Sequence, residues 1–275
     1  MNSGQKAVKY IGIFIGVLLA ICIIGAIAQL AIGIFRWAAG DIDMPTADFA
    51  QSYSEPITDL RVQNGVGEVR LVAGDTWRVE ASGVASSFKS EVQNGRLTIR
   101  DQRRSFLFHL GGGKTPVITV YVPEARLNSV YLETGAGKIT VDAALEADTV
   151  RVDGGAGECR ISKVTADSLK VDQGVGRADV LEGDVGRLDL DGGVGAFRYA
   201  GRLTGDADID GGVGEVRLEL TGSASDFNYD VDNGVGDVRV DGNRLSDGKV
   251  RNAGASHTIK VDNGVGAILI NFTAE

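Results

Sequence analysis

The chain has 275 residues, of which 43% are hydrophobic, 39 are glycine and only 4 are proline. Glycine is about twice its usual share of ~7%, but no Gly-X-Y period and few prolines exclude both collagen and a disordered Pro/Gly tract. Residues 1–40 carry three basic and no acidic side chains, so residues 41–275 carry a formal net charge of −12. Such an acidic body argues against nucleic-acid binding.

The first predicted element is a long apolar segment that follows Lys6 and Lys9. At a rise of about 1.5 Å per residue, a helix over residues 10–37 is long enough to cross a hydrocarbon core of about 30 Å. Because flanking lysines favour the cytoplasmic side, we expect residues 1–9 in the cytoplasm. The sequence therefore predicts a single-pass cell-membrane protein with a linker at 38–57 and an extracytoplasmic C-terminal domain.

A cleaved signal peptide is the alternative for this segment, since Ala26-Ile27-Ala28 forms an A-x-A-like site. The apolar run continues to Phe35, well beyond a secretory h-region of ~7–15 residues. This length favours the uncleaved anchor.

The next part of the chain, residues 58–128, holds several strand-like stretches outside any regular repeat. They lie at residues 76–82, 89–100 and 116–123, and Asn94-Gly95 closes a hairpin within the second. We expect this part to cap the N-terminal end of the repeat that follows, as repeat proteins commonly require.

Residues 100–114, RDQRRSFLFHLGGGK, interrupt this part with basic and aromatic side chains in an otherwise acidic body. Basic residues meet anionic headgroups and aromatic residues insert at membrane surfaces. The segment is therefore a candidate contact with a partner or the membrane, through Arg103, Arg104, Phe106 and Phe108. The alternative is an inserted strand that buries the two phenylalanines.

Residues 129–275 are dominated by near-copies of one motif, of which LDLDGGVGAFRY (188–199) is typical. Each copy has an apolar-x-apolar run, then Gly-Val-Gly or Gly-Ala-Gly, then a second alternating run, and an earlier copy stands at 60–71. The first glycines are 65, 135, 155, 174, 193, 212, 234 and 264, so most steps are 19 or 20 residues. Alternation with period two indicates half-buried strands, and a fixed period indicates a repeat architecture.

The favoured fold is all-β: a β-solenoid of ~19-residue rungs in which each strand pairs in parallel with its copy. The residue between the two glycines is always Val or Ala, so we expect Val194 to point inward at a corner. A meander or sandwich is the alternative, with the glycine motifs as hairpin loops. The longer step after Gly234 predicts an inserted loop at 242–256, and an uncapped last repeat predicts an exposed C-terminal edge.

The glycine motif does not match known phosphate or calcium loops. A dinucleotide loop needs a third glycine and a following helix, whereas Ala196-Phe197-Arg198 begins a strand. The calcium β-roll needs an Asp where Val216 stands. One acid per repeat precedes the glycines instead, and we expect these acids to form a solvated column; weak divalent-ion binding is the alternative.

Little in the sequence favours catalysis or a disulfide. His109 and His257 are the only histidines, and no nucleophile–His–Asp spacing accompanies them. Cys22 lies in the apolar segment and Cys159 at an apolar repeat position, so no disulfide framework is expected. We predict no enzyme activity, no cofactor and no metal.

Several of these stretches together resemble the toastrack-type β-solenoid family of bacterial envelope proteins, also called "putative adhesin" domains. They are the basic-flanked anchor, LRVQNGVGEVRL (60–71), VITVYVPEARLNSVYLETGAGKITV (117–141) and the later glycine repeats. The resemblance covers residues 58–272. It implies a membrane-tethered, non-enzymatic, adhesin-like protein, and some relatives accompany envelope-stress systems.

We therefore expect a membrane-anchored binding or scaffold protein with an envelope protein partner, and a homo-oligomer stays open. One alternative is a carbohydrate-active enzyme, which needs two carboxylates roughly 5–10 Å apart. The other is a structural protein that self-assembles through its last repeat.

Overall fold

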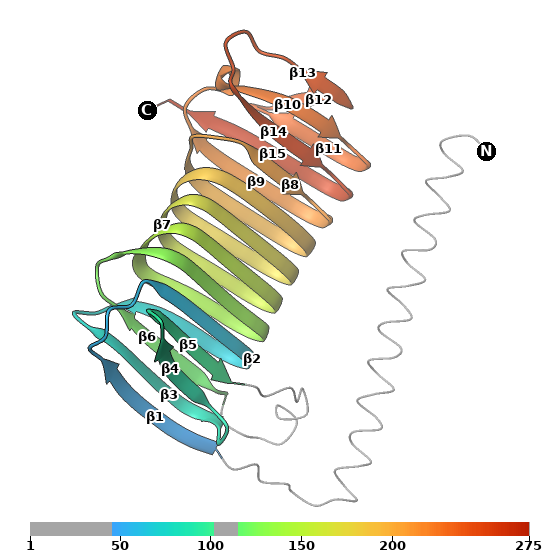
Figure 1. Ribbon diagram of the computed structural model, residues 1–275. Helices are drawn as coiled ribbons and strands as arrows, with labels where there is room; N and C mark the ends of the chain where they lie inside the picture. The colour runs from blue at the N-terminus through green and yellow to red at the C-terminus, as the bar shows by residue number, and fades with distance from the viewer. Residues whose placement is uncertain (1–45, 102–114, 275) are drawn as a thin grey trace, which may run out of the picture. The chain divides into compact units, whose positions relative to one another are not determined.

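The structure is a computed structural model that describes residues 46–101 and 115–274 (Figure 1). Within these residues all regular elements are β-strands except one short 3-10 helix, η2 (Ala224–Asp226), so the all-β prediction is confirmed. The predicted anchor at 10–37 lies outside the described residues. Among the residues that are described, no helix is both long and apolar enough to span a membrane.

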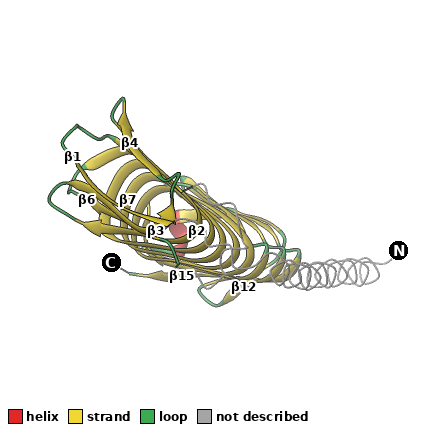
Figure 2. Cartoon of the chain, turned by 90° about the horizontal axis from the view of Figure 1, so that it is seen from below, coloured by secondary structure: helices red, strands yellow, loops and turns green. Residues whose placement is uncertain are grey.

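The repeats form a β-solenoid whose middle is one continuous strand, β7 (Arg126–Leu203), coiled through several rungs (Figure 1). Its end pairs in parallel with β8 (Ala207–Asp210) and β9 (Val213–Thr221), and Leu188 lies opposite Ala207, 19 positions later. Seen along the stack, the rungs superpose (Figure 2). The predicted parallel pairing of each repeat with a neighbouring copy is thus confirmed.

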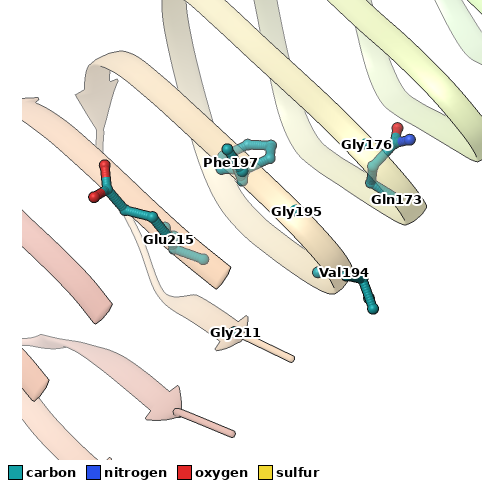
Figure 3. A pocket seen from close by; sticks show the side chains of 11 residues that line it. Gln173, Gly176, Val194, Gly195, Phe197, Gly211 and Glu215 are labelled. Carbon is teal, nitrogen blue, oxygen red and sulfur yellow. The ribbon is translucent and has the colours of Figure 1, made fainter. Parts of the chain in front are cut away.

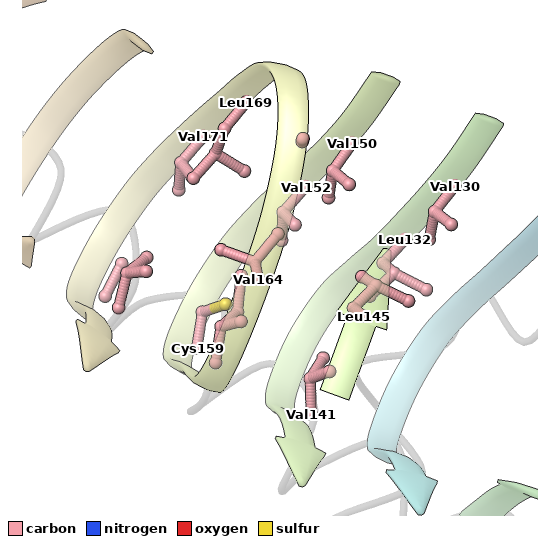
Figure 4. Packing of buried hydrophobic residues seen from close by; sticks show 14 of the residues in the cluster. Val130, Leu132, Val141, Leu145, Val150, Val152, Cys159, Val164, Leu169 and Val171 are labelled. Atoms are coloured by element: carbon pink, nitrogen blue, oxygen red, sulfur yellow. The ribbon is translucent and has the colours of Figure 1, made fainter. Parts of the chain in front are cut away.

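The interior of the solenoid is filled by the apolar positions of the alternating pattern. Leu188, Leu190, Phe197 and Tyr199 are all buried, as the alternation predicts. Equivalent side chains of successive rungs stack into columns (Figure 4), such as Val130, Val150 and Leu169. Burying one such side chain contributes about 1.5–3 kcal/mol, so the columns supply most of the stability.

The second glycine of the motif allows the rungs to stack closely at the corner. Gly195 has φ +149°, and a Cβ added there would overlap the carbonyl oxygen of Gly176 in the rung below. The same overlap recurs between Gly176 and Gly157 and between Gly214 and Gly195. Glycine is needed here both for its backbone conformation and for the close approach of neighbouring backbones.

At the C-terminal end the last two repeats are stacked in the reverse of their sequence order. β14 (His257–Asp262) and β15 (Val265–Thr273) pair in parallel with β8 and β9. On their other side they pair in parallel with β10 (Phe227–Asp232) and β11 (Val235–Val240). The last repeat in the sequence is therefore an inner rung.

The predicted inserted loop at 242–256 forms a cap on the outer rung. β12 (Asn243–Leu245) pairs antiparallel with β11, and β13 (Gly248–Val250) pairs antiparallel with β10. The prediction of an uncapped last repeat is therefore wrong, because the insertion folds back over the rung that precedes it.

The N-terminal end has a similar arrangement. β2 (Asp59–Ala73) lies between β7 on one side and a rung made of β5 (Arg96–Asp101) and β6 (Val117–Val122) on the other, all in parallel. Three antiparallel strands complete this end. They are β3 (Trp77–Ala85) on β6, β1 (Thr46–Tyr53) on β3, and β4 (Lys89–Gln93) on β5.

Two sequence predictions for this end can be compared with these strands. β4 and β5 are joined through Asn94 and Gly95, both of positive φ, as the predicted hairpin requires. β1 falls within the stretch 38–57 assigned to a linker, so the folded body begins earlier along the chain. Its sequence, TADFAQSY, has too little apolar alternation to mark a strand.

Candidate functional site: the corner of the rungs

An apolar ridge of exposed and half-buried side chains runs along the glycine corner of the solenoid. The residue between the two glycines stands at the outer apex, and Val175, Val194 and Val265 are 54%, 41% and 41% exposed. Register places Val213 between Val194 and Val265, with Val235 beyond. We call this the valine ridge; in stacking order it comprises Val66, Ala136, Ala156, Val175, Val194, Val213, Val265 and Val235.

The ridge contradicts the prediction that Val194 points inward. Leu190 and Phe197 both point inward but are separated by an odd number of positions, so the alternation must shift phase between them. The shift takes place at Gly193 and Gly195, and Val194 is left on the outside of the bend.

An acidic column lies beside the valine ridge on the strand that enters each corner. Asp191 lies opposite Asp210, Asp210 opposite Asp262, and Asp262 opposite Asp232, so the predicted column forms, although its last two members are not in chain order. Parallel neighbours lie about 4.8 Å apart, where like charges repel. The acidic column comprises Glu133, Asp153, Asp172, Asp191, Asp210, Asp262 and Asp232.

The N-terminal end of the acidic column is compensated by side chains two positions earlier in the repeat. The Tyr131 hydroxyl lies 3.0 Å from Glu133 Oε2 and 2.8 Å from Asp153 Oδ2. Arg151 Nε lies 2.9 Å from Asp153 Oδ1, and the Arg61 guanidinium lies over the Tyr131 ring. Burial and these two carboxylates raise the pKa of Tyr131. The sequence analysis does not predict this network, although its tyrosine and arginines occupy the same position of their repeats.

The rest of the acidic column lacks close ion-pair partners. In the described part of the chain, no ion pair within 4.0 Å involves Asp172, Asp191 or Asp210. Burial, followed by the neighbouring Asp191 and Asp153, raises the pKa of Asp172. Asp210 accepts a hydrogen bond from the Gly212 amide at 3.1 Å, so a local Asx bond forms in that rung.

A small pocket opens at the same corner between the rungs of Gly192 and Gly211 (Figure 3). Other rungs have a buried polar side chain at this inner position, such as Asn64, Thr134 and Asn263. The two glycines lack one, and the space left, about 10 Å³, suits one water molecule. A metabolite or nucleotide does not fit there.

The chemistry available at the corner is that of a charged, apolar-edged surface. Within the described ranges, 46–101 and 115–274, no three His, Cys, Asp or Glu side chains gather in a metal-binding arrangement. The acidic column offers one carboxylate per rung, fewer than the six or more oxygens that calcium takes. Cys159 is a free thiol that is buried inside the solenoid, so it does not contribute to this surface.

The predicted contact residues Arg103, Arg104, Phe106 and Phe108 lie outside the described residues. The strands before and after this segment are described: β5 ends with Asp101 opposite Asn64, and β6 begins with Val117 opposite Glu68 in β2.

Comparison with known proteins identifies the fold family. The family model Toastrack DUF4097 matches residues 57–252. No curated protein is significantly similar to the chain in sequence.

Solved structures with a similar chain path come from several bacteria. A putative cell adhesion protein from Clostridium sporogenes is 19% identical, with a TM-score of 0.40, covering 83% of this chain and 100% of its own. A putative adhesin from Bacteroides fragilis is 14% identical, with a TM-score of 0.42, covering 82% of this chain and 98% of its own. The words adhesion and adhesin in these names describe those two proteins.

Proposed function

Because the chain belongs to the Toastrack DUF4097 family, we propose that it is an adhesin-like binding or scaffold protein of the bacterial cell envelope and not an enzyme. The observation that carries the proposal is the pairing of the valine ridge with the acidic column. The valine ridge begins in the rung of β2 and the acidic column one rung later, at Glu133, and each then continues with one side chain per rung to the outer C-terminal rung.

This geometry suits recognition of an extended partner. A partner with apolar groups and cationic groups at regular spacing could contact several rungs at once, and each further contact is intramolecular after the first. The carboxylates of Asp172, Asp191 and Asp210, which have no close ion-pair partner, would attract the cationic groups and accelerate association. Exposed Val175 and Val194 would supply the apolar contacts.

The same proposal places the domain outside the cell membrane. Its support is the basic-flanked apolar segment at 10–37 with the whole described body on its C-terminal side. A link with envelope-stress signalling follows from the family resemblance and belongs to this proposal. A cysteine introduced at exposed Gly254 tests the topology: a membrane-impermeant maleimide should label it in spheroplasts without lysis, and labelling only after lysis would contradict it.

The binding function is tested with the full chain in its own cells by chemical crosslinking and affinity purification. A crosslinked partner should be recovered with the wild type and lost or reduced at least several-fold with Val175→Thr/Val194→Thr, which keeps the β-branched shape. Val250→Thr is the matched control, since Val250 is 37% exposed but lies off the ridge. Equal recovery from all three would reject the ridge, and release of sugars from envelope polysaccharide by the purified chain would favour the enzyme alternative.

A further inference from the structure

The two ends of the stack differ in how their outer strands are protected. β1 is at one end of the sheet path and β13 at the other (Figure 1). An outer strand leaves about half of its backbone N–H and C=O groups without a strand partner, and it can pair with another chain. Proteins usually block such edges with short strands, charges or proline.

The C-terminal end is blocked in this manner. β12 and β13 have only three residues each. Arg244 lies 2.9 Å from Asp237, and Lys249 lies 2.9 Å from Asp230, so both strands carry charge at the edge. These features disfavour pairing with another strand.

At the N-terminal end, β4 is short and carries Lys89 and Glu91, but β1 lacks these protections. β1 has eight residues, contains no proline or lysine, and among residues 46–101 and 115–274 pairs only with β3. Its one charged residue, Asp48, accepts a hydrogen bond from the Gly83 amide at 3.1 Å. Ala50, Gln51 and Ser52 are exposed, and a single register shift between Ala47 and Phe49 is its only irregularity.

We propose that the outer edge of β1 is a strand-pairing surface for a second copy of this chain, joined antiparallel about a two-fold axis through Ala50. This register pairs Asp48 of each copy with the Ser52 hydroxyl of the other. Because the axis passes through one residue, paired side chains of the two copies point to the same face, and both cores lie on the same side of the joined sheet. The same β1 edge of both copies is paired in this contact, so the dimer is closed and β1 is not available to extend it into a fibre. The inference goes beyond the binding function and does not depend on it.

Disulfide trapping in the full chain tests the register, with Cys22 replaced by serine. In the two-fold pair the two Ala50 Cα atoms lie about 4.5–5.5 Å apart, within the span of a disulfide. The two Thr46 residues lie eight positions out of register, about 26 Å apart at ~3.3 Å per residue. After mild oxidation, Ala50→Cys should give a band at twice the 28.8 kDa chain mass, at least tenfold stronger than the band from Thr46→Cys or Val250→Cys.

Equal bands from Ala50→Cys and Thr46→Cys would overturn the proposal, since parallel pairing or random collision gives that result. Ala50→Cys crosslinked only to a different protein, or unable to form any crosslink while the chain is folded, would overturn it also. As a second measurement, light scattering of the full chain in detergent should give two chains for the wild type and one for Ala50→Lys/Ser52→Lys, with the Tm unchanged. A single chain in the wild type contradicts the pairing.

Discussion

Replacing Gly195 with alanine tests why the corner glycine is required. The residue has φ +149°, a conformation that costs about 1–3 kcal/mol for a non-glycine residue. Its new Cβ would also overlap the Gly176 carbonyl oxygen, and forcing one methyl group into a packed site costs about 1–3 kcal/mol. We therefore expect Gly195→Ala to lower the free energy of unfolding by about 2–6 kcal/mol, a large part of the usual total of about 5–15 kcal/mol.

Two matched variants separate the two causes. Gly248 has φ +121° with nothing within 4 Å of an added Cβ, so Gly248→Ala should show the conformational cost alone. Gly193 is not among the positive-φ glycines, but an added Cβ would overlap the Gly174 carbonyl oxygen, so Gly193→Ala should show the packing cost alone.

Urea unfolding of the full chain, followed by circular dichroism, measures the three costs. Hydrogen exchange should show lost protection mainly in the rungs on either side of residue 195, because each rung contacts only its neighbours. If Gly195→Ala is no more destabilising than Gly248→Ala, close stacking at the corner does not occur as described.

Three further predictions follow from the acidic column and the core. Asp172→Asn removes the repulsion with Asp191 and Asp153, so it should raise the free energy of unfolding at pH 7 by roughly 0.2–1 kcal/mol for each of these two neighbours. Because the folded pKa of Asp172 is raised, this gain should appear as the pH rises through that pKa and vanish below the unfolded value of ~3.9; a pH-independent difference in Tm would contradict it. Burial raises the pKa of the Cys159 thiol to about 12, so a maleimide at pH 8 should label it only after unfolding, and rapid labelling of the native protein would argue against its burial. Tyr131→Phe should cost about 0.5–1.5 kcal/mol by removing the hydroxyl beside Asp153, as measured by urea unfolding, and an unchanged midpoint would show that the hydroxyl contributes nothing.

The interior and the parallel stacking could be predicted from the sequence, because both depend on local patterns. Leu188, Leu190, Phe197 and Tyr199 alternate with polar residues, and alternation assigns one face to the core. The identical spacing of successive repeats then fixes a parallel register, with Asp191 opposite Asp210.

The order of the terminal rungs could not be predicted, because it depends on which of several near-identical edges meet. The repeats around Gly234 and Gly264 share the sequence VDNGVG, so either could stack on the rung of Gly212. The connections before and after the outer rung, residues 222–226 and 241–256, both depart from the regular spacing of the repeat. Only tertiary packing selects the one in which Gly264 stacks directly on Gly212.

The surface was partly predicted. The acidic column follows from one acid per repeat, but the position of Val194 does not, because strict alternation hides the phase shift between Leu190 and Phe197. The Tyr131 network was also missed. Its signal is the position two residues before the acid, which holds Tyr131 and Arg151 in two early repeats but Asp189 in a later one.

The central claim is that the corner of the rungs binds an envelope partner, and site-specific photocrosslinking in living cells tests it most directly. A photoreactive amino acid replaces Val194 on the valine ridge in the full chain, and in parallel replaces Val250, which is exposed at 37% but off the ridge. Crosslinks to one defined partner from position 194, with few or none from position 250, are the result that we predict. No crosslink from position 194, or the same products from both positions, would contradict the claim.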